Sequence, residues 1–177
     1  DLLIGAYLAD GPGNSKSYAG ESYLLFGKAD WSASPTIDLA NLGSAGVTIY
    51  GADIDDFSGY SLSGAGDVNG DGIDDFVIGA ERADGVDNLE SRAGDTYLIF
   101  GISDWSAVPT IDLSNLGALG VTIRGADADD FSGRAVSDVG DVNGDGFDDL
   151  FIGARYADGE NNLKNAAGES YLLFGKS

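Results

Sequence analysis

Asp67-Val68-Asn69-Gly70-Asp71-Gly72-Ile73-Asp74-Asp75 is the stretch from which the rest of the chain is best understood. Oxygen-bearing side chains stand at positions 1, 3, 5 and 9 of this run, and glycine stands at position 6. The spacing is typical of a calcium loop, because alternating side chains converge on one cation and glycine allows the sharp turn. The pattern returns as Asp141-Val142-Asn143-Gly144-Asp145-Gly146-Phe147-Asp148-Asp149. The sequence therefore predicts two Ca²⁺ sites.

Each predicted site combines side-chain ligands with the backbone carbonyl of the residue at position 7. The ligands expected for the first ion are Asp67, Asn69, Asp71, Asp75 and the carbonyl of Ile73. Those expected for the second ion are Asp141, Asn143, Asp145, Asp149 and the carbonyl of Phe147. Asp1 aligns with Asp75, so it is expected to be the last ligand of a third loop whose earlier positions precede the sequence.

The residues after each loop exclude a helix–loop–helix calcium site. Such a site needs a bidentate Glu at position 12, where this chain has Ile78 and Ile152. A short apolar run bounded by glycine follows each loop and favours a buried strand, so the loop is expected to join two strands. The alternative is an Asp/Asn/Gly turn that binds nothing. Two loops with every ligand in register favour the calcium interpretation.

Composition excludes several function classes. The 177 residues include no Cys and no His, so disulfides, a Ser-His-Asp triad and an ordinary zinc site are excluded. The net charge of −21 disfavours binding to nucleic acid or to anionic membranes. No apolar stretch approaches the roughly 20 residues that a membrane-spanning helix needs. Paired carboxylates could in principle cleave glycosides, but the acidic residues in register are explained as calcium ligands, so we expect no enzyme.

The chain repeats itself at a fixed offset of 74 residues. Residues 1–74 and 75–148 are roughly two-thirds identical without a gap, as in stacked structural repeats. Within one repeat, strands are expected at 59–63, 76–78, 96–100 and 121–123, with the middle pair buried on both faces. The fold class predicted is all-β, built of consecutive four-stranded antiparallel β-propeller blades with a calcium loop between the first and second strands.

Two further features leave alternatives open. The segments 30–43 and 104–117 are expected to be ordered loops that cap the outer edge of a blade. Their Trp31 and Trp105 are interpreted as core residues, with sugar-stacking platforms as the alternative. The acidic runs 53–56 and 127–130 are interpreted as solvated turns, with a second cation site as the alternative.

The motifs together resemble a known family. Phe57-Ser58-Gly59, the first loop and Ile78-Gly79-Ala80 resemble the FG-GAP repeat of integrin α-subunit propellers. The longer unit, with its Trp and Ile-Asp-Leu insert, is similar to FG-GAP arrays of bacterial, especially cyanobacterial, surface proteins. The resemblance implies a β-propeller, usually seven-bladed, with calcium between the first two strands of a blade. It also implies a role in extracellular adhesion or matrix structure. Phe-Ser-Gly in place of Phe-Gly is a minor departure.

This reading divides the chain into three parts. Residues 1–58 would be a partial blade with strands two to four, 59–132 a complete blade, and 133–177 a partial blade with strands one to three. We therefore expect a segment of a longer array, or a subunit completed by other copies. The predicted function is that of a calcium-binding structural module, extracellular or at the cell surface, whose partners are further repeats or copies. The alternative is an adhesin whose loops bind an extracellular protein or glycan.

Overall fold

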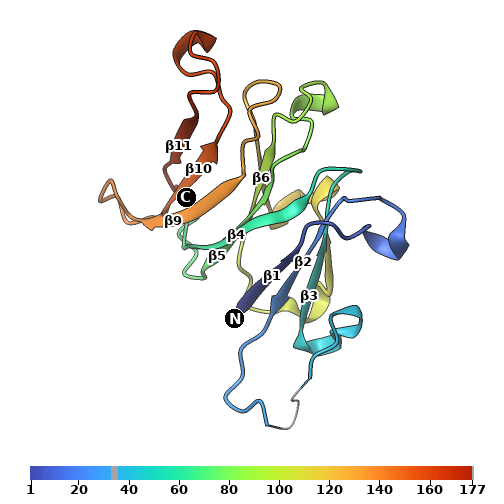
Figure 1. Cartoon of the computed structure of the whole chain (residues 1–177). Helices are drawn as coiled ribbons and strands as arrows, with labels where there is room; N and C mark the ends of the chain where they lie inside the picture. Colours follow the sequence, from blue (N-terminus) through green and yellow to red (C-terminus); the bar gives the residue numbers. More distant parts are fainter. Residues whose placement is uncertain (33–35, 177) are drawn as a thin grey trace.

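The computed structural model describes residues 1–32 and 36–176, and over these residues the protein is all-β (Figure 1). Short 3-10 turns join the strands, and the described residues contain no α-helix, hence no helix that could cross a membrane. The strands, in chain order, are β1 (Leu2–Ala6), β2 (Glu21–Leu25), β3 (Gly46–Tyr50), β4 (Ser58–Gly66), β5 (Asp75–Ala80), β6 (Asp95–Ile99), β7 (Thr110–Asp112), β8 (Gly120–Arg124), β9 (Ala135–Gly140), β10 (Asp149–Ala154) and β11 (Glu169–Leu173). The all-β prediction is confirmed.

The strands form three sheets that follow one another along the chain. The middle sheet has the order β4-β5-β6-β8, and every neighbouring pair in it is antiparallel. The third sheet has the order β9-β10-β11, also antiparallel. Figure 1 shows the sheets side by side: β4, the edge strand of the middle sheet, lies next to β1 of the first sheet, and β9, the edge strand of the third sheet, lies next to β4. The strands predicted from the second repeat are all present.

The first sheet contains a strand that the sequence did not predict. Its order is β1-β2-β3-β7, and β7 pairs parallel to β3, in register from Thr48 with Thr110 to Tyr50 with Asp112. The insert of the second repeat thus adds a strand to the outer edge of the preceding sheet, where a capping loop was expected. Ile111 in this strand is 2% exposed and joins the core. Its apolar side chain, flanked by exposed Thr110 and Asp112, provides the alternation that suits an edge strand.

The core lies in two layers, one on each face of the middle sheet. Phe76 and Ile78 of β5 point toward the first sheet, where they pack with Leu24 and Ile49. Val77 lies between them in sequence and packs on the other face, against Leu150 of the third sheet. Successive side chains of a strand point to opposite faces, so a strand covered on both sides reads as a continuous apolar run. All residues of β5 and β6 are buried, as predicted for the middle pair.

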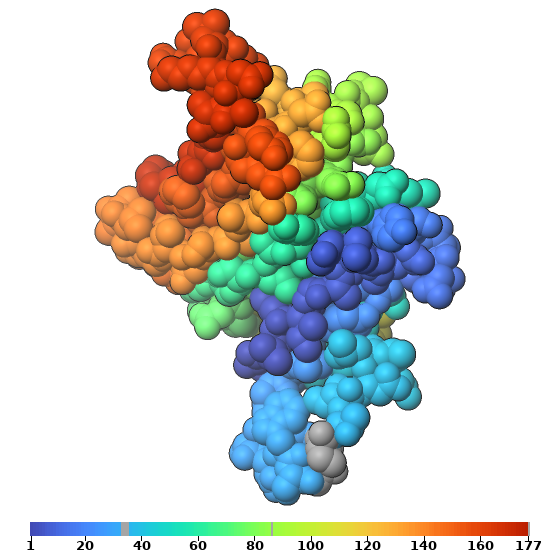
Figure 2. Space-filling model, viewed as in Figure 1, coloured from blue at the N-terminus to red at the C-terminus, as the bar shows by residue number. Residues whose placement is uncertain are grey.

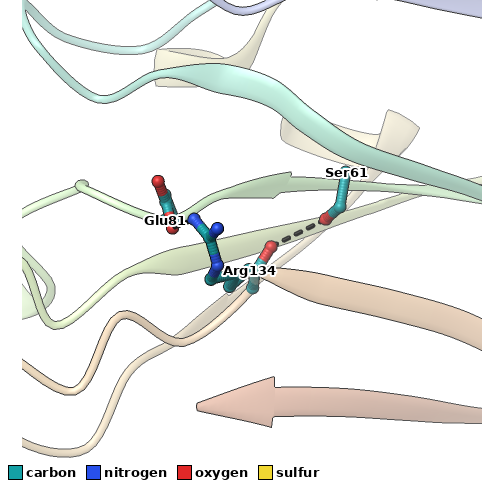
Figure 3. A network of polar contacts seen from close by, with 4 residues as sticks. Ser61, Glu81 and Arg134 are labelled. Atoms are coloured by element: carbon teal, nitrogen blue, oxygen red, sulfur yellow. Dashed lines mark hydrogen bonds and ion pairs between the residues drawn. The ribbon is translucent and has the colours of Figure 1, made fainter. Parts of the chain in front are cut away.

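Glycines set how closely the sheets approach. A Cβ on Gly79 of β5 would collide with the carbonyl oxygen of Gly133, just before β9, and a Cβ on Gly5 would collide in the same way with Gly59. Polar contacts close this junction: the Ser61 hydroxyl donates to the carbonyl of Gly133 at 2.7 Å, and Arg134 pairs with Glu81 at 2.5 Å (Figure 3). Glycine in Phe-Ser-Gly and in Ile-Gly-Ala is therefore required by backbone contact between neighbouring sheets.

The surface view shows the consequence of this stacking (Figure 2). The three parts of the chain touch along their length, while the segment around residue 30, in light blue, projects at one end.

Candidate metal centre

The two predicted calcium loops occupy equivalent turns. Residues 67–74 connect β4 to β5, and residues 141–148 connect β9 to β10. In each case the strand before the loop ends with a register shift against its partner strand. The shift lies between Gly64 and Gly66 where β4 pairs with β5, and next to Gly140 where β9 pairs with β10. A bulge of this kind sharpens the local twist and frees the chain for a turn.

Asp67, at position 1, organises the first loop through backbone hydrogen bonds. Its carboxylate accepts the N–H groups of Gly70 at 2.8 Å, Asp71 at 3.0 Å and Gly72 at 2.9 Å. In the second loop Asp141 accepts the equivalent N–H groups at 2.7, 3.1 and 2.9 Å. The loop backbone therefore curls around the carboxylate at position 1, and glycine at position 6 supports this curl with a φ of +87° at Gly72.

The side chains at positions 3 and 5 are held against each other. The N–H of Asp71 donates to the amide oxygen of Asn69 at 2.8 Å, and the N–H of Ile73 donates to Asp71 at 2.9 Å. The amide nitrogen of Asn69 donates to the other oxygen of Asp71 at 3.1 Å. Asn143 and Asp145 repeat these contacts in the second loop. Both loops thus hold the side chains at positions 1, 3 and 5 in the same arrangement.

Position 9 is the buried end of each loop. Asp75 is 2% exposed, and its two oxygens accept the N–H groups of Gly101 at 2.8 Å and Val68 at 3.1 Å. Asp149 accepts the equivalent N–H groups of Gly175 and Val142, both at 2.9 Å. Each oxygen retains a lone pair, so a carboxylate held in this way can still ligate a cation.

Asp1 occupies the corresponding place in the first sheet. Its carboxylate accepts the N–H of Gly27 at 2.7 Å, which matches the bond from Gly101 to Asp75. The alignment of Asp1 with Asp75 in the sequence is therefore also an alignment in space.

Electrostatics differ between the two ends of the loop. Burial raises the pKa of Asp75, opposed by its backbone hydrogen bonds and reinforced by the negative charges of Asp71 and Asp67. The backbone N–H of Gly146 lowers the pKa of the exposed Asp141. A cation in the loop would relieve the repulsion among carboxylates that lie close together.

The metal assignment itself stays a prediction. Across residues 1–32 and 36–176, no three Asp or Glu side chains are gathered as a metal ion would need for direct ligation by them alone. Each predicted set contains three aspartates, for example Asp67, Asp71 and Asp75, and the structure does not gather these three carboxylates at one point. The structure brings positions 1, 3 and 5 into contact and ties position 9 to the loop backbone, and the donors present are the oxygen ligands that Ca²⁺ prefers.

One role at the loop escaped sequence reasoning. Asp148, at position 8 of the second loop, accepts the N–H of Asp67 at 2.8 Å, and Lys176 donates its N–H to the carbonyl of Val68 at 2.9 Å. These bonds link the first loop to the third sheet. The available signal was the Asp at position 8 of both loops, which calcium spacing does not require.

The two tryptophans have different surroundings. Trp105 packs partly buried against the core next to Phe76, with ring centroids 6.4 Å apart. Trp31 is 43% exposed, and the Lys28 ammonium lies 4.6 Å from the centre of its ring. The core interpretation is confirmed for Trp105 and is wrong for Trp31, because the segment around Trp31 projects from the sheets instead of packing on one.

With this geometry in place, comparison with known proteins becomes informative. The model of the FG-GAP repeat family matches residues 58–99 and 134–173. The chain carries FG-GAP repeats. Each matched FG-GAP segment contains one of the loops and the strands on both sides of it. Integrin alpha-PS2 of Drosophila melanogaster is 35% identical to this FG-GAP chain over 112 residues, which is 61% of the chain and 7% of that protein. The chain thus spans a small part of its relative, and the two are similar as integrin-α-like FG-GAP sequences.

Proposed function

We propose that this chain is a calcium-stabilised structural segment of an extracellular or cell-surface protein, in which the sheets stack as blades of a β-propeller or of a larger array. The observation that carries the proposal is the identical hydrogen-bonded cage of both loops, built around the carboxylates of Asp67 and Asp141. The similarity to integrin-type FG-GAP repeats, which are generally not enzymatic, supports it. Residues 1–58, 59–132 and 133–177 would then be a partial, a complete and a second partial blade.

Calcium in this role would be structural. The ion would neutralise the carboxylates at positions 1, 5 and 9 and fix the turn between the first two strands of a blade. Modules outside the cell meet millimolar calcium, which suits the weak sites found in extracellular domains. At tenfold excess over the dissociation constant, each site would stabilise the fold by about 1.4 kcal/mol.

Stacking is supported by the position of apolar side chains on the third sheet. Val77 and Leu98 of the middle sheet are buried under the third sheet, at 0% and 7% exposure. Their counterparts one repeat later are Phe151 and Leu172, which are 41% and 42% exposed. The same face that receives a sheet in the middle of the chain is therefore open on the third sheet, and a further FG-GAP repeat or another copy is the partner it fits.

The direct test compares the wild-type chain with the double variant Asp67→Asn, Asp141→Asn. Calcium should raise the melting temperature of the wild type by on the order of 5–10 °C, and the double variant should lose most of this shift. Isothermal titration calorimetry should find at least two calcium ions per wild-type chain. The variant Asp74→Asn, which removes a loop charge at a position with no ligand role, is the matched control and should retain the shift. An equal calcium shift in the double variant would refute the loop assignment.

A second candidate function rests on the exposure of Trp31. An exposed tryptophan on a projecting loop suits the adhesin alternative, because an aromatic ring can stack on a sugar face. Glycan-array binding that is lost in Trp31→Ala and kept in wild type would support an adhesin. If neither the wild type nor Trp31→Ala bound any glycan or matrix protein, the adhesin candidate would be refuted and the structural module would be the function retained.

A further inference from the structure

A second acidic site lies between the first and middle sheets, away from the calcium loops. It is a cavity of about 160 Å³ lined by Asp53 and Asp56 of the β3–β4 turn, Asp95 and Tyr97 of β6, and Ser114, among others. Asp56 and Asp95 are 5% and 7% exposed. The interpretation of residues 53–56 and 127–130 as solvated turns is therefore wrong for Asp56 and for Asp130, which is 6% exposed.

Asp95 has a carboxylate oxygen without a partner. Its Oδ1 atom is buried and forms no hydrogen bond in the structure. The repeats show why. Glu21 and Glu169, which stand at the same place in the first and third sheets, accept the hydroxyl of the tyrosine two residues later, Tyr23 or Tyr171. Aspartate is one methylene shorter than glutamate. No hydrogen bond joins Asp95 to Tyr97 in the structure, and both residues line the cavity.

The charge in the cavity is unbalanced. Burial, the largest cause, raises the pKa of Asp56 to about 7, and the charges of Asp53, Asp95 and Asp84 add to the shift. Burial likewise raises the pKa of Asp95 to about 6, and the charge of Asp84 adds to it. Two cations lie near the cavity. Arg124 lowers the pKa of Asp95 but forms no ion pair with it in the described chain, and the Lys16 ammonium donates to the carbonyl of Ala52 at 2.6 Å. The cavity is thus lined by three carboxylates, those of Asp53, Asp56 and Asp95, and by one basic side chain, that of Arg124. Burying an ionised carboxylate is costly unless positive charge compensates it.

We propose that this cavity is a second cation site, in which a divalent metal ion binds between Asp56 and Asp95 with part of its water shell retained. The cavity has room for on the order of five water-sized molecules, enough for one ion and several waters. Hydroxyl groups of Tyr97 and Ser114 line it and can accept the hydrogen bonds of those waters. A hydrated ion also fits the finding that no three carboxylates of the described residues converge on one point. The ion would bridge the turn after β3 to strand β6, and so join two sheets.

The variant Asp95→Glu is the sharpest test, because it places in the middle repeat the residue that the other two repeats have. The longer side chain should reach Tyr97 and accept its hydroxyl, as Glu21 and Glu169 accept theirs, so the carboxylate would no longer be available to the ion. Bound calcium at saturation, measured by equilibrium dialysis with atomic emission, should fall by one ion per chain relative to wild type. In chelator, Asp95→Glu should melt higher than wild type, because it satisfies a buried oxygen without an ion.

Three further variants make the result independent of whether Asp95→Glu folds and of whether the loops bind calcium. Asp56→Asn, which preserves volume, should also lose one ion, so a poorly folded Asp95→Glu chain would not prevent a decision. The matched control is Asp55→Asn. Asp55 is an exposed residue next to Asp56, its φ is positive, which Asn tolerates, and the variant should keep every ion. The loop variant Asp67→Asn, Asp141→Asn should lose loop ions and keep this one, which separates the two proposals. Equal numbers of bound ions in wild type, Asp95→Glu and Asp56→Asn would overturn the site and mean that protons alone neutralise the cavity.

Discussion

At the scale of the residue, glycine and aspartate determine most of what is specific to this chain. Gly79 lies against the backbone of Gly133, so the junction between sheets has no space for a side chain. Asp67 and Asp141 organise their loops through backbone N–H groups, before any ion is considered. The repeated motifs therefore mark close contacts of backbone with backbone, in addition to the predicted cation ligands.

Gly79→Ala should destabilise the fold by about 2 kcal/mol or more, because the new Cβ meets a carbonyl oxygen that cannot move without shifting the next sheet. Urea unfolding followed by circular dichroism measures this. Gly64→Ala is the matched control, since a Cβ on Gly64 would meet no atom within 4 Å, and it should be neutral or slightly stabilising. Equal losses in the two variants would show that the sheet junction does not require glycine.

Residue spacing predicted the loops but not all their neighbours. The side chains at positions 1, 3, 5 and 9 could be proposed as ligands because their spacing is local in sequence. The bond from Asp67 to Asp148 could not, because it joins residues 81 positions apart and depends on how two sheets stack. The same limit applies to Asp95: its departure from Glu21 and Glu169 is visible in the sequence, but its burial is not.

At the scale of the element, strand β7 shows how one repeat is tied to another. The insert was expected to be a loop, because three residues between turns are too few to indicate a strand. No local sequence pattern shows which strand such a segment would pair with. The structure pairs these residues with β3, which belongs to the preceding repeat. The antiparallel strands were predicted because each has its partner nearby in sequence and carries a near-continuous apolar run.

Ile111→Ala should cost about 2–4 kcal/mol, since its side chain is 2% exposed and packs in the core between the first two sheets. The loss can be read from the midpoint of chemical unfolding. Thr110→Ala, in the same strand but on the exposed side, should change stability by less than about 0.5 kcal/mol. A negligible effect of Ile111→Ala would mean that β7 does not hold the first sheet in solution.

At the scale of the whole molecule, stacking of sheets explains where apolar surface is buried and where it is open. The fold class and the repeat length followed from the sequence, because composition and periodicity are properties of the entire chain. The number of sheets in the working assembly did not follow, because each repeat makes the same contacts whether few or many others are present.

Phe151→Ser with Leu172→Ser should abolish association between copies with little change in the stability of the single chain, because both side chains are about two-fifths exposed. Light scattering would show a multimer for wild type in calcium and a monomer for the double variant. Val77→Ser, the buried counterpart of Phe151, should instead destabilise the single chain by several kcal/mol, since it is fully buried between sheets. A wild-type chain that stays monomeric with calcium and with chelator would contradict the assembly proposal.

The parallel pairing of β3 with β7 has a mechanical consequence. A force applied to the segment before β3 and to the segment after β7 would pull β3 toward its N-terminal end and β7 toward its C-terminal end. The three paired positions from Thr48 with Thr110 to Tyr50 with Asp112 would then be loaded in shear, all at once instead of one after another. Strands β4, β5 and β6 of the middle sheet, which lie in the chain between β3 and β7, would be shielded from tension until this pairing failed. In the proposed role at a cell surface, the short strand β7 would therefore also set the load that the first sheet can bear.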